Sequence, residues 1–311
     1  MSFSTSVNIS RDFGNTPDYI VTANARQAVG KIINQYTTGI HSFCLIGSYG
    51  TGKSSFVLAL ENCLLGKTTG NDVLLNNNGQ FDNYQKFSFL NIVGDYASMS
   101  SVLSDAIKAE DANCLASFES YYNKVHNKGK FLVVVVDEFG KILEHAAKNN
   151  PEKEMYFLQK FCEFVNDSNK NILFIATLHQ GFNAYAKGLK ESQKQEWTKV
   201  KGRIYDIVFN EPIEQLLNLT ASRLSTKVSG PVTENVNKVY QLAVKSKFVS
   251  NNLKSEVAAS LYPMDVLSAY VLTIANQKYG QNERTLFTFL ESTGEGSISA
   301  FDANDNELYN L

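Results

Sequence analysis

The chain has few cysteines, prolines and tryptophans, and its charges nearly balance. Its 311 residues include four cysteines, five prolines and one tryptophan, with a formal net charge of −2. The cysteines are widely separated and have neither metal-ligand nor redox-pair spacing; they are Cys44, Cys63, Cys114 and Cys162. We therefore expect buried free thiols and a reducing setting, and no disulfide framework or cysteine metal site.

Long apolar runs are also missing. The longest, Phe131–Val136, is far shorter than a membrane-spanning helix requires, and Met1–Thr5 lacks the features of a signal peptide. These absences predict a cytoplasmic protein with no membrane partner. The small net charge gives no global electrostatic case for nucleic acid or an anionic surface. The hydrophobic content of 43% and the length allow one large globular domain or two modest ones.

One run of eight residues carries the clearest chemical signal. It reads Gly47-Ser48-Tyr49-Gly50-Thr51-Gly52-Lys53-Ser54 and matches GxxxxGK[ST]. In this pattern glycines let successive backbone N–H groups face phosphate oxygens, with the positive end of the following helix directed at the same anion. The lysine would reach the β- and γ-phosphates, and the serine hydroxyl would bind Mg²⁺.

The sequence on either side supports this interpretation. An apolar run of strand length, 41–46, precedes the glycines, and residues 55–65 carry apolar side chains at helical spacing. The alternative is an ordinary glycine-rich turn. Strand, glycine loop and helix together are what a phosphate-binding loop requires, so we predict that residues 47–55, Ser55 included, bind nucleotide.

A second candidate half-site follows the β-branched run that ends at Val136. Asp137 and Glu138 stand at the carboxyl end of this predicted buried strand, where open α/β sheets bind ligands. Asp137 could hold Mg²⁺, and Glu138 could polarise the water that attacks the γ-phosphate. The alternative is that both acids merely begin the next helix, where the helix dipole favours them.

Further strands alternate with helical segments. Strands are predicted at 85–93, 171–177 and 203–209, and helices at about 98–108 and 152–164. This alternation predicts an α/β fold with a doubly wound parallel sheet. The segment 66–84 is rich in Asn, Gly and Thr, which indicates an exposed loop or insertion.

Beyond Pro212 the strand signals end and helical periodicity takes over. A helix is predicted over 213–224, and Pro231 and Pro263 look like first-turn prolines of further helices. Another short helix is predicted near Glu283. We therefore expect an α/β nucleotide-binding domain at 1–210, an all-helical lid at 211–291 and a polar tail or truncated linker at 292–311.

A phosphate-binding loop, a strand ending in Asp-Glu and a helical lid resemble the AAA+ ATPase superfamily, most closely its origin-recognition and signalling branches. The resemblance covers nearly the whole chain and implies ATP and Mg²⁺ as cofactors. It also implies a sensor 1 residue at Thr177, with His179 as the competing candidate because the usual Asn is absent. Asn91 resembles the polar switch that restrains the catalytic Glu, although a backbone-bonding Asn is an equal alternative.

The same resemblance assigns roles to four other residues. Arg203 corresponds to an arginine finger inserted into a neighbour's site, and the alternative is a solvated arginine in a basic stretch. Arg284 resembles the sensor 2 arginine of the lid, and the alternative is an exposed arginine paired along its helix. Ile20 and Val21 lie where the superfamily contacts adenine.

Three segments are similar to ATPases of bacterial anti-phage defence loci. They are 179–180, 197–203 and 282–290. On this resemblance we expect a homo-oligomeric ATPase that acts on a protein effector, with ATP and ADP as ligands. Two alternatives remain open: a slow-turnover nucleotide-gated adaptor, and a DNA-stimulated ATPase that uses the basic stretch 187–203 on phosphates.

Overall fold

A computed structural model describes residues 7–15, 19–67, 81, 86–109, 113–211, 213–224, 230–249, 253–279, 289–290, 298 and 308–309. The chain divides into two compact units. The first is an α/β unit made of Val7–Gly47 and Gly52–Asn210, and the second groups Ser48–Thr51 with the described residues from Glu211 onward. The two units are described separately below.

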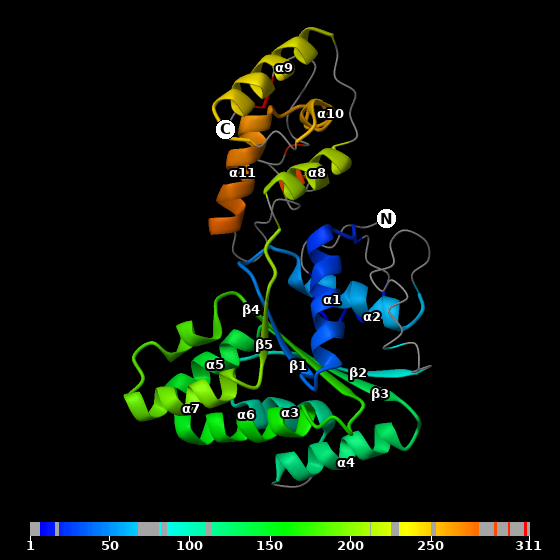
Figure 1. Ribbon diagram of the computed structural model, residues 1–311, viewed down its shortest axis with the longest axis vertical. Coiled ribbons are helices and arrows are strands. Elements are labelled where there is room, and N and C mark those ends of the chain that lie inside the picture. Colours follow the sequence, from blue (N-terminus) through cyan, green and yellow to red (C-terminus); the bar gives the residue numbers. More distant parts are fainter. Residues whose placement is uncertain are drawn as a thin grey trace. The chain divides into compact units, whose positions relative to one another are not determined.

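A five-stranded parallel sheet organises the α/β unit (Figure 1). Its strands are β1 (Ser42–Ile46), β2 (Phe87–Val93), β3 (Phe131–Asp137), β4 (Ile172–Leu178) and β5 (Tyr205–Val208), in the order β2-β3-β4-β1-β5. The predicted parallel α/β fold is confirmed. Because β4 lies between β1 and β3, the glycine loop and Asp137 leave strands that are not neighbours.

Side chains of the central strands alternate between two cores, as a period of two requires. In β3, Val133 and Val135 pack with the helices on one face, whereas Val134 and Val136 pack with those on the other. All four valines are essentially inaccessible to solvent. A strand buried on both faces explains the unbroken β-branched run in the sequence.

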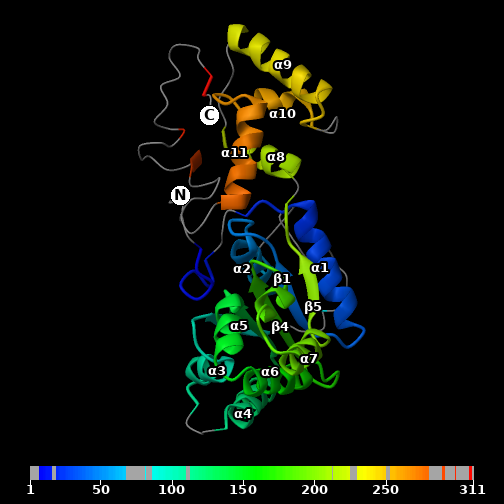
Figure 2. The same cartoon turned by 90° about the vertical axis from the view of Figure 1, so that its left-hand side faces the viewer.

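In the described part of the chain, helices pack on both faces of the sheet (Figure 2). The first face carries α1 (Ala23–Tyr36) and α2 (Lys53–Leu64). The second carries α3 (Met99–Ile107), α4 (Cys114–His126), α5 (Phe139–Lys148), α6 (Pro151–Val165) and α7 (Glu191–Lys201), with the 3₁₀-helix η2 (Phe182–Ala186) between β4 and α7.

Local sequence accounts for several helix starts. The Thr22 side chain accepts the Ala25 N–H at 3.0 Å before α1, and Asn150 caps α6 with Pro151 as its first residue. The predicted strand over 203–209 was too long, because Arg203 and Ile204 still form a turn after α7 and bond back to Val200 and Lys201.

The second unit is helical wherever it has regular structure among the described residues, apart from an isolated bridge between Met264 and Tyr309. Its helices are α8 (Ile213–Arg223), α9 (Gly230–Lys245), α10 (Ser255–Ala259) and α11 (Val266–Tyr279). They share one apolar core that includes Leu217, Leu261 and Met264.

The two proline predictions had different outcomes. Pro231 lies in the first turn of α9, as expected. The expectation for Pro263 was wrong, because α11 begins three residues later at Val266. The Asp265 carboxylate is the cap there, accepting the N–H groups of Leu267 and Ser268 at 2.7 and 3.0 Å. The helix predicted near Glu283 lies almost wholly outside the described residues.

Within the described part of the chain, no helix combines the length and apolarity needed to cross a bilayer. The same residues contain no group of three or more His, Cys, Asp or Glu side chains arranged to hold a metal ion. Any metal held here would therefore need hydroxyl, amide, water or ligand oxygens beside a carboxylate.

The backbone of Gly94, directly after β2, lies very close to the backbone at the end of β3. Its N–H donates to the Asp137 carbonyl oxygen at 2.7 Å. A Cβ at this position would lie 2.5 Å from the Glu138 carbonyl oxygen and 3.0 Å from that of Asp137. Both obstacles are backbone atoms, which cannot rotate away as a side chain could, so this approach requires glycine.

We expect Gly94→Ala to lower the free energy of unfolding by about 1–3 kcal/mol, because the β3–α5 turn must shift to admit a methyl group. Gly30→Ala is the matched control. Gly30 lies within α1 with open space around its Cβ position, so alanine there should raise stability by about 0.5–1 kcal/mol. Urea unfolding followed by circular dichroism measures both. Equal effects of the two substitutions would contradict the steric reason.

Candidate nucleotide-binding site

The glycine-rich loop connects β1 to α2 and ends in two left-handed glycines. Gly50 and Gly52 have φ of 72° and 81°, and Gly52 is the cap of α2. A residue with a side chain rarely adopts these angles. Lys53 is therefore the first helical residue, and the positive end of the α2 dipole lies at the end of the loop, where an anion is favoured.

Lys53 lies at this helix end with its ammonium directed back to the loop. Its Nζ donates to the Gly47 carbonyl oxygen at 2.6 Å. Burial lowers the pKa of the Lys53 ammonium to about 8, while the Asp137 carboxylate acts in the opposite direction. A phosphate in the loop would supply the missing negative charge, so the site is electrostatically suited to a polyphosphate.

The Asp137 carboxylate is the hub of the site. Ser54 Oγ donates to Asp137 Oδ2 at 2.7 Å, and Thr177 Oγ1 donates to Asp137 Oδ1 at 2.5 Å. The three side chains come from α2, β3 and β4, whose carboxyl-terminal or amino-terminal ends meet at one edge of the sheet. Asp137 and Thr177 are 6% and 2% exposed, so these contacts form away from bulk water.

Ser54 and Asp137 also suit a magnesium ion. A hydroxyl and a carboxylate are hard oxygen donors, and Mg²⁺ in nucleotide sites takes one or two such ligands and completes its shell with water and phosphate. The Ser54–Asp137 hydrogen bond shows that the two oxygen ligands lie close enough to bind one ion together. The predicted metal ligands therefore fit the ion chemically.

Glu138 occupies a turn that redirects the chain from β3 into α5. Its φ is 54°, and its N–H donates to Thr177 Oγ1 at 3.0 Å and to Asp137 Oδ1 at 3.2 Å. The Glu138 carboxylate forms an ion pair with Lys141, and both side chains are about half exposed, at 47% and 51%. Glu138 stands at the N-cap position of α5 without a capping hydrogen bond from its side chain, whereas Asp137 is the last residue of β3.

Two aromatic residues after β4 pack against this turn. The Tyr185 hydroxyl hydrogen-bonds to His179 Nδ1 at 3.1 Å. A Cβ added to Gly140 would collide with that hydroxyl and would lie 3.2 Å from His179 Cε1. Burial is the main reason that the pKa of His179 is lowered, and the charges of Glu144, Lys53 and Glu138 also act on the ring.

Asn91, the predicted switch residue, lies two positions before the end of β2. Asn91 is in register with Val135, two residues before Asp137, and its side chain points to α2. Its Nδ2 donates to the Ile9 carbonyl at 3.1 Å and to Glu61 Oε2 at 3.2 Å. The residue of β2 in register with Asp137 is Val93. In this structure Asn91 therefore links the segment before α1 to α2, and its role as a switch stays a prediction.

Its partner Glu61 is a buried carboxyl group on α2. The residue is 2% exposed, and its Oε1 lacks a hydrogen-bond partner. Burial raises the pKa of Glu61 to about 8, although the Asn91 hydrogen bond partly opposes this. The group is therefore largely protonated at neutral pH, which spares the core an unpaired charge.

Arg203 lies at the other edge of the sheet. It precedes β5, whereas the glycine loop follows β1, and these two strands run parallel. Its Nη2 donates to Glu163 Oε1 at 2.8 Å and its Nη1 to the Lys199 carbonyl at 2.6 Å. Lys160, Gln159 and Arg203 lower the pKa of Glu163 to about 2. Arg203 therefore does not reach the phosphate site of its own chain.

The remaining predicted positions are less informative. Ile20 is 38% exposed, and Val21 is partly buried against the core shared by α1 and α2. Arg284 lies outside the described residues. The sites proposed at these three positions stay predictions.

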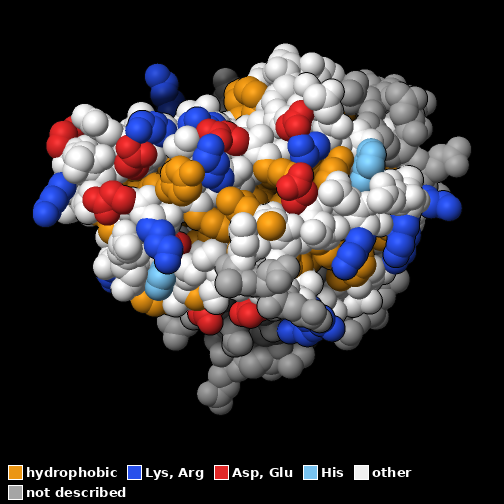
Figure 3. All heavy atoms as spheres, turned by 90° about the horizontal axis from the view of Figure 1, so that it is seen from below, with side chains coloured by type: hydrophobic (Ala, Val, Ile, Leu, Met, Phe, Trp, Pro, Cys, Tyr) orange, Lys and Arg blue, Asp and Glu red, His pale blue; other side chains and the backbone are white. Residues whose placement is uncertain are grey.

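The basic stretch 187–203 is largely neutralised by nearby carboxylates. Four of its six cations have an acidic partner, in the pairs Lys194–Glu191, Lys199–Glu196, Lys201–Asp206 and Arg203–Glu163. The last two acids lie outside the stretch and could not be assigned to it from the sequence. Figure 3 shows acidic and basic side chains interspersed on one face of the molecule. The charge expected to attract nucleic acid is thus mostly compensated.

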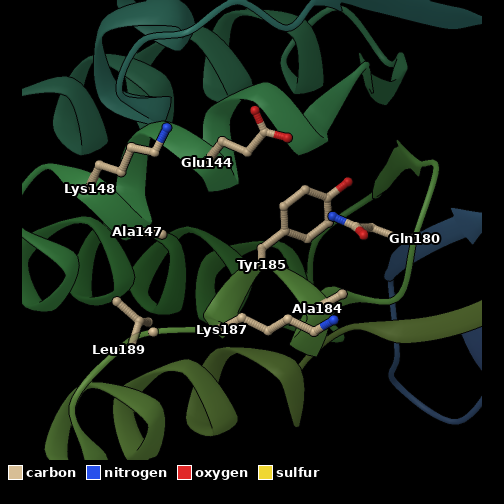
Figure 4. Close-up of a pocket in the computed structure, with 9 residues that line it drawn as sticks. Glu144, Ala147, Lys148, Gln180, Ala184, Tyr185, Lys187 and Leu189 are labelled. Atoms are coloured by element: carbon tan, nitrogen blue, oxygen red, sulfur yellow. The ribbon is translucent and has the colours of Figure 1, made fainter.

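A pocket of about 360 Å³ lies beside Tyr185 (Figure 4). Its lining comes from α5, the end of β4 and η2 with the segment that follows, and includes Glu144, Lys148, Gln180 and Lys187. Tyr185 thus lines the pocket and also contacts His179. This arrangement was not predictable from the sequence, because a tyrosine six residues after a histidine is a common spacing without a known meaning.

Sequence reasoning missed Gly94, Gly140, Lys141 and Tyr185. Lys141 alone had a usable signal, since it stands three residues after Glu138 at the start of a helix, where ion pairs form. The two glycines are required by contacts between segments distant in sequence. Such contacts leave no local pattern.

No protein-family model matches this sequence, and no curated protein matches it either. Among solved structures, the ORC2 protein of Aeropyrum pernix (ADPNP and ADP complexes) is similar with a TM-score of 0.44 and 12% identity, over 83% of this chain and 71% of that one. PCH-2 of C. elegans is similar with a TM-score of 0.40 and 12% identity, over 85% and 61%.

A third similar structure is the ORC1 protein of Aeropyrum pernix in complex with DNA. Its TM-score is 0.39 and its identity 13%, over 86% of this chain and 63% of that one. Likeness at this level does not identify an activity for the present chain. The function has to be argued from the site itself.

We expect Glu61→Gln to remove a pH dependence of stability. The ordinary pKa of this carboxyl group is 4.5, and in the folded chain it is about 8. Between these two pH values the folded chain keeps a proton that the unfolded chain has released. The contribution of Glu61 to the free energy of unfolding is therefore fully present below pH 4.5 and is lost as the pH rises through 8. The neutral glutamine should gain stability on the order of a few kcal/mol at pH 8 and little at pH 5.

Thermal unfolding of both proteins between pH 5 and 8 measures this difference. Glu119→Gln, which removes an exposed carboxylate on α4, is the control and should change stability by less than about 0.5 kcal/mol at every pH. A constant offset between Glu61→Gln and the unaltered protein would contradict the protonation of Glu61.

Proposed function

We propose that this chain is a Mg²⁺-dependent ATP hydrolase of the AAA+ type. The observation that carries the proposal is the convergence of Lys53, Ser54 and Asp137 at the edge of the sheet where the glycine loop ends. A basic group at a helix start suits phosphate, and the adjacent hydroxyl and carboxylate suit its metal ion. Glu138, next to Asp137, supplies a base at the same edge.

Each residue has a distinct part in the proposed reaction. Lys53 and the loop N–H groups bind the β- and γ-phosphates, and Ser54 and Asp137 hold the metal. When bound there, Mg²⁺ would supply positive charge that stabilises the negative charge developing in the reaction. Glu138 accepts a proton from water as the water oxygen bonds to the γ-phosphorus. The bond from that phosphorus to the β–γ bridging oxygen breaks, and ADP and phosphate leave.

The ion pair between Glu138 and Lys141 favours one alternative, a slow-turnover nucleotide switch. While its carboxylate is paired with Lys141, Glu138 is not placed to accept a proton from water. Pairs between half-exposed side chains are worth about 0–1 kcal/mol, which amounts to roughly a fivefold change in population. The pair can slow hydrolysis to that extent, but it is too weak to abolish it, so we favour the hydrolase.

We further propose that full activity requires a second copy of the chain. Arg203 lies at the amino-terminal ends of the strands, whereas the phosphate site of the same chain lies at their carboxyl-terminal ends. It can therefore act only in the site of a neighbouring copy. In the best-studied NTPases, an arginine finger of this kind raises the rate of hydrolysis by a factor of about 10³–10⁵. Its ion pair with Glu163 would have to open on assembly.

The wider role follows from the sequence resemblance alone. We propose domains at 1–210 and 211–291, with the helical part as a lid and 292–311 as a linker. A bacterial anti-phage defence system with a separate protein effector is the proposed setting, in the cytoplasm. Most of the cations in 187–203 have acidic partners, which weighs against the DNA-stimulated alternative.

We expect Lys53→Ala to lose measurable ATP binding and Glu138→Gln to bind ATP normally while its hydrolysis falls by about 10²–10⁴. Fluorescent-nucleotide titration and phosphate release measure the two quantities. Lys31→Ala, an exposed lysine of α1, is the control and should leave both unchanged. Tight binding by Lys53→Ala, or full turnover by Glu138→Gln, would refute the assigned roles.

Mixing two inactive variants tests whether a second copy of the chain completes the active site. Arg203→Ala keeps an intact phosphate site and Glu138→Gln keeps an intact arginine, so their mixture should regain activity at interfaces that combine the two. Each alone should stay at least about tenfold below the unaltered protein. Glu163→Gln, which frees Arg203 without removing it, separates loss of the finger from loss of the ion pair. An Arg203→Ala protein as active as the unaltered chain would end the proposal.

A further inference from the structure

The pocket beside Tyr185 lies against one face of α5. Its volume of about 360 Å³ is near the lower end of the range for ligand pockets, about 300–1,000 Å³, so it suits one small molecule. Glu144 and Lys148 line it, and a spacing of four residues puts both on the same helix face as Gly140. Figure 4 shows these α5 side chains on one side of the Tyr185 ring and Lys187 on the other.

Two lysine ammonium groups at this pocket have no acidic partner. In the described part of the chain, no carboxylate lies within ion-pairing distance of Lys148 or Lys187. The Lys148 ammonium lies over the Tyr96 ring, 5.6 Å from its centroid. Lys187 begins the basic stretch 187–203, in which most of the other cations are paired with acids. Part of the uncompensated charge of that stretch is therefore at the pocket, where a bound anion would balance it.

The lining matches a small phosphate monoester in both charge and hydrogen bonding. Such a group carries about −1.5 to −2 charges at neutral pH, which two ammonium groups can balance, and lysine binds phosphate as a compact point charge. Glu144 and Gln180 also line the pocket. A carboxylate accepts hydrogen bonds and an amide both donates and accepts them, so these two side chains suit the hydroxyl groups of an organic portion. Ala184 and Leu189 offer apolar contact to its carbon atoms.

Tyr185 connects the pocket with the turn at the end of β3. Its hydroxyl hydrogen-bonds to His179 Nδ1 at 3.1 Å and fits beside Gly140, where an added Cβ would collide with it. Gly140 lies in the first turn of α5, and Glu138 is the residue at the N-cap position of that helix. A ligand that moves Tyr185 or α5 therefore also moves the backbone at Glu138.

We propose that this pocket is a second ligand site, which binds a small phosphate monoester and is coupled through Tyr185 and α5 to the Glu138 turn. Lys148 and Lys187 hold the phosphate, and Glu144 accepts hydrogen bonds from hydroxyl groups of the organic portion. The binding site stands without the proposed hydrolase, and only its coupling to ATP rests on that function. Coupling is reciprocal, so bound ATP must change the affinity for the ester by the same factor as the ester changes the affinity for ATP.

Isothermal titration calorimetry with three esters tests the site: ribose 5-phosphate, glucose 6-phosphate and glycerol 3-phosphate. Because the glycine loop also attracts phosphate, the parent protein for these titrations is Lys53→Ala. At least one ester should bind it saturably. Adding Lys148→Ala and Lys187→Ala should weaken that binding at least about tenfold, because each hydrogen bond to a charged group contributes roughly a factor of ten. Inorganic phosphate should bind more weakly than the ester, and ribose should not bind measurably.

Two further variants separate a defined pocket from a diffuse basic surface. Lys190→Ala is the matched charge control, because Lys190 is an exposed lysine of the same stretch outside the lining. Its loss should change the affinity by less than about threefold, since exposed charges are screened. Ala184→Leu narrows the pocket without changing its charge and should weaken binding as much as the double lysine variant does. Circular dichroism confirms that each variant is folded.

Coupling is measured in the unaltered protein by repeating the titration with a slowly hydrolysed ATP analogue at saturation. The affinity for the ester should change by at least about fivefold. Tyr185→Phe, which lacks the hydroxyl beside Gly140, should reduce this change.

The outcomes distinguish this site from the nucleotide site. Failure of all three esters to bind Lys53→Ala, or equal weakening by Lys190→Ala and by the double lysine variant, would overturn the pocket as a ligand site. The same affinity with and without bound analogue would overturn the coupling. Saturable ester binding by a chain that does not bind ATP would defeat the proposed function alone and would support the pocket.

Discussion

The short contacts of the Asp137 carboxylate hold the candidate site together. One oxygen accepts the Ser54 hydroxyl and the other accepts the Thr177 hydroxyl, so a single side chain links the start of α2 to the ends of β3 and β4. The β4 strand stands between β1 and β3. The Ser54 hydrogen bond connects α2 with the acidic strand end directly, and the Thr177 hydrogen bond adds the intervening strand to the same carboxylate. Glu138 depends on the same group, because its N–H bonds to both Thr177 and Asp137.

Close backbone approach is the second constraint on this edge of the sheet. Gly94 brings the end of β2 against the carbonyl groups of Asp137 and Glu138, and Gly140 leaves room for His179 and Tyr185 beside α5. Packing on both sides therefore fixes a turn whose left-handed φ at Glu138 is otherwise unfavourable. Glu138 therefore has a defined backbone position, while its carboxylate is half exposed and forms an ion pair with Lys141.

A residue's place in the structure was predictable when it depends on neighbours in the sequence, and not when it depends on contacts with distant segments. The strands around Val133 and Ile175 were predictable because a parallel strand buried on both faces needs an uninterrupted apolar run. The contacts of Asn91 were not predictable, because its partner Glu61 lies on α2 and its place in the sheet depends on register with β3. Pro263 misled because the turn before α11 is capped by Asp265 instead.

Local spacing was enough to predict the parallel α/β class and the loop residues, because left-handed turns favour glycine and a core on both sides of a strand needs β-branched runs. The partner of each polar side chain depends instead on the folded chain. Arg203 pairs with Glu163 and Asn91 with Glu61, and strand order and helix packing bring these distant segments together. Those are properties of the folded chain as a whole, and no local pattern encodes them.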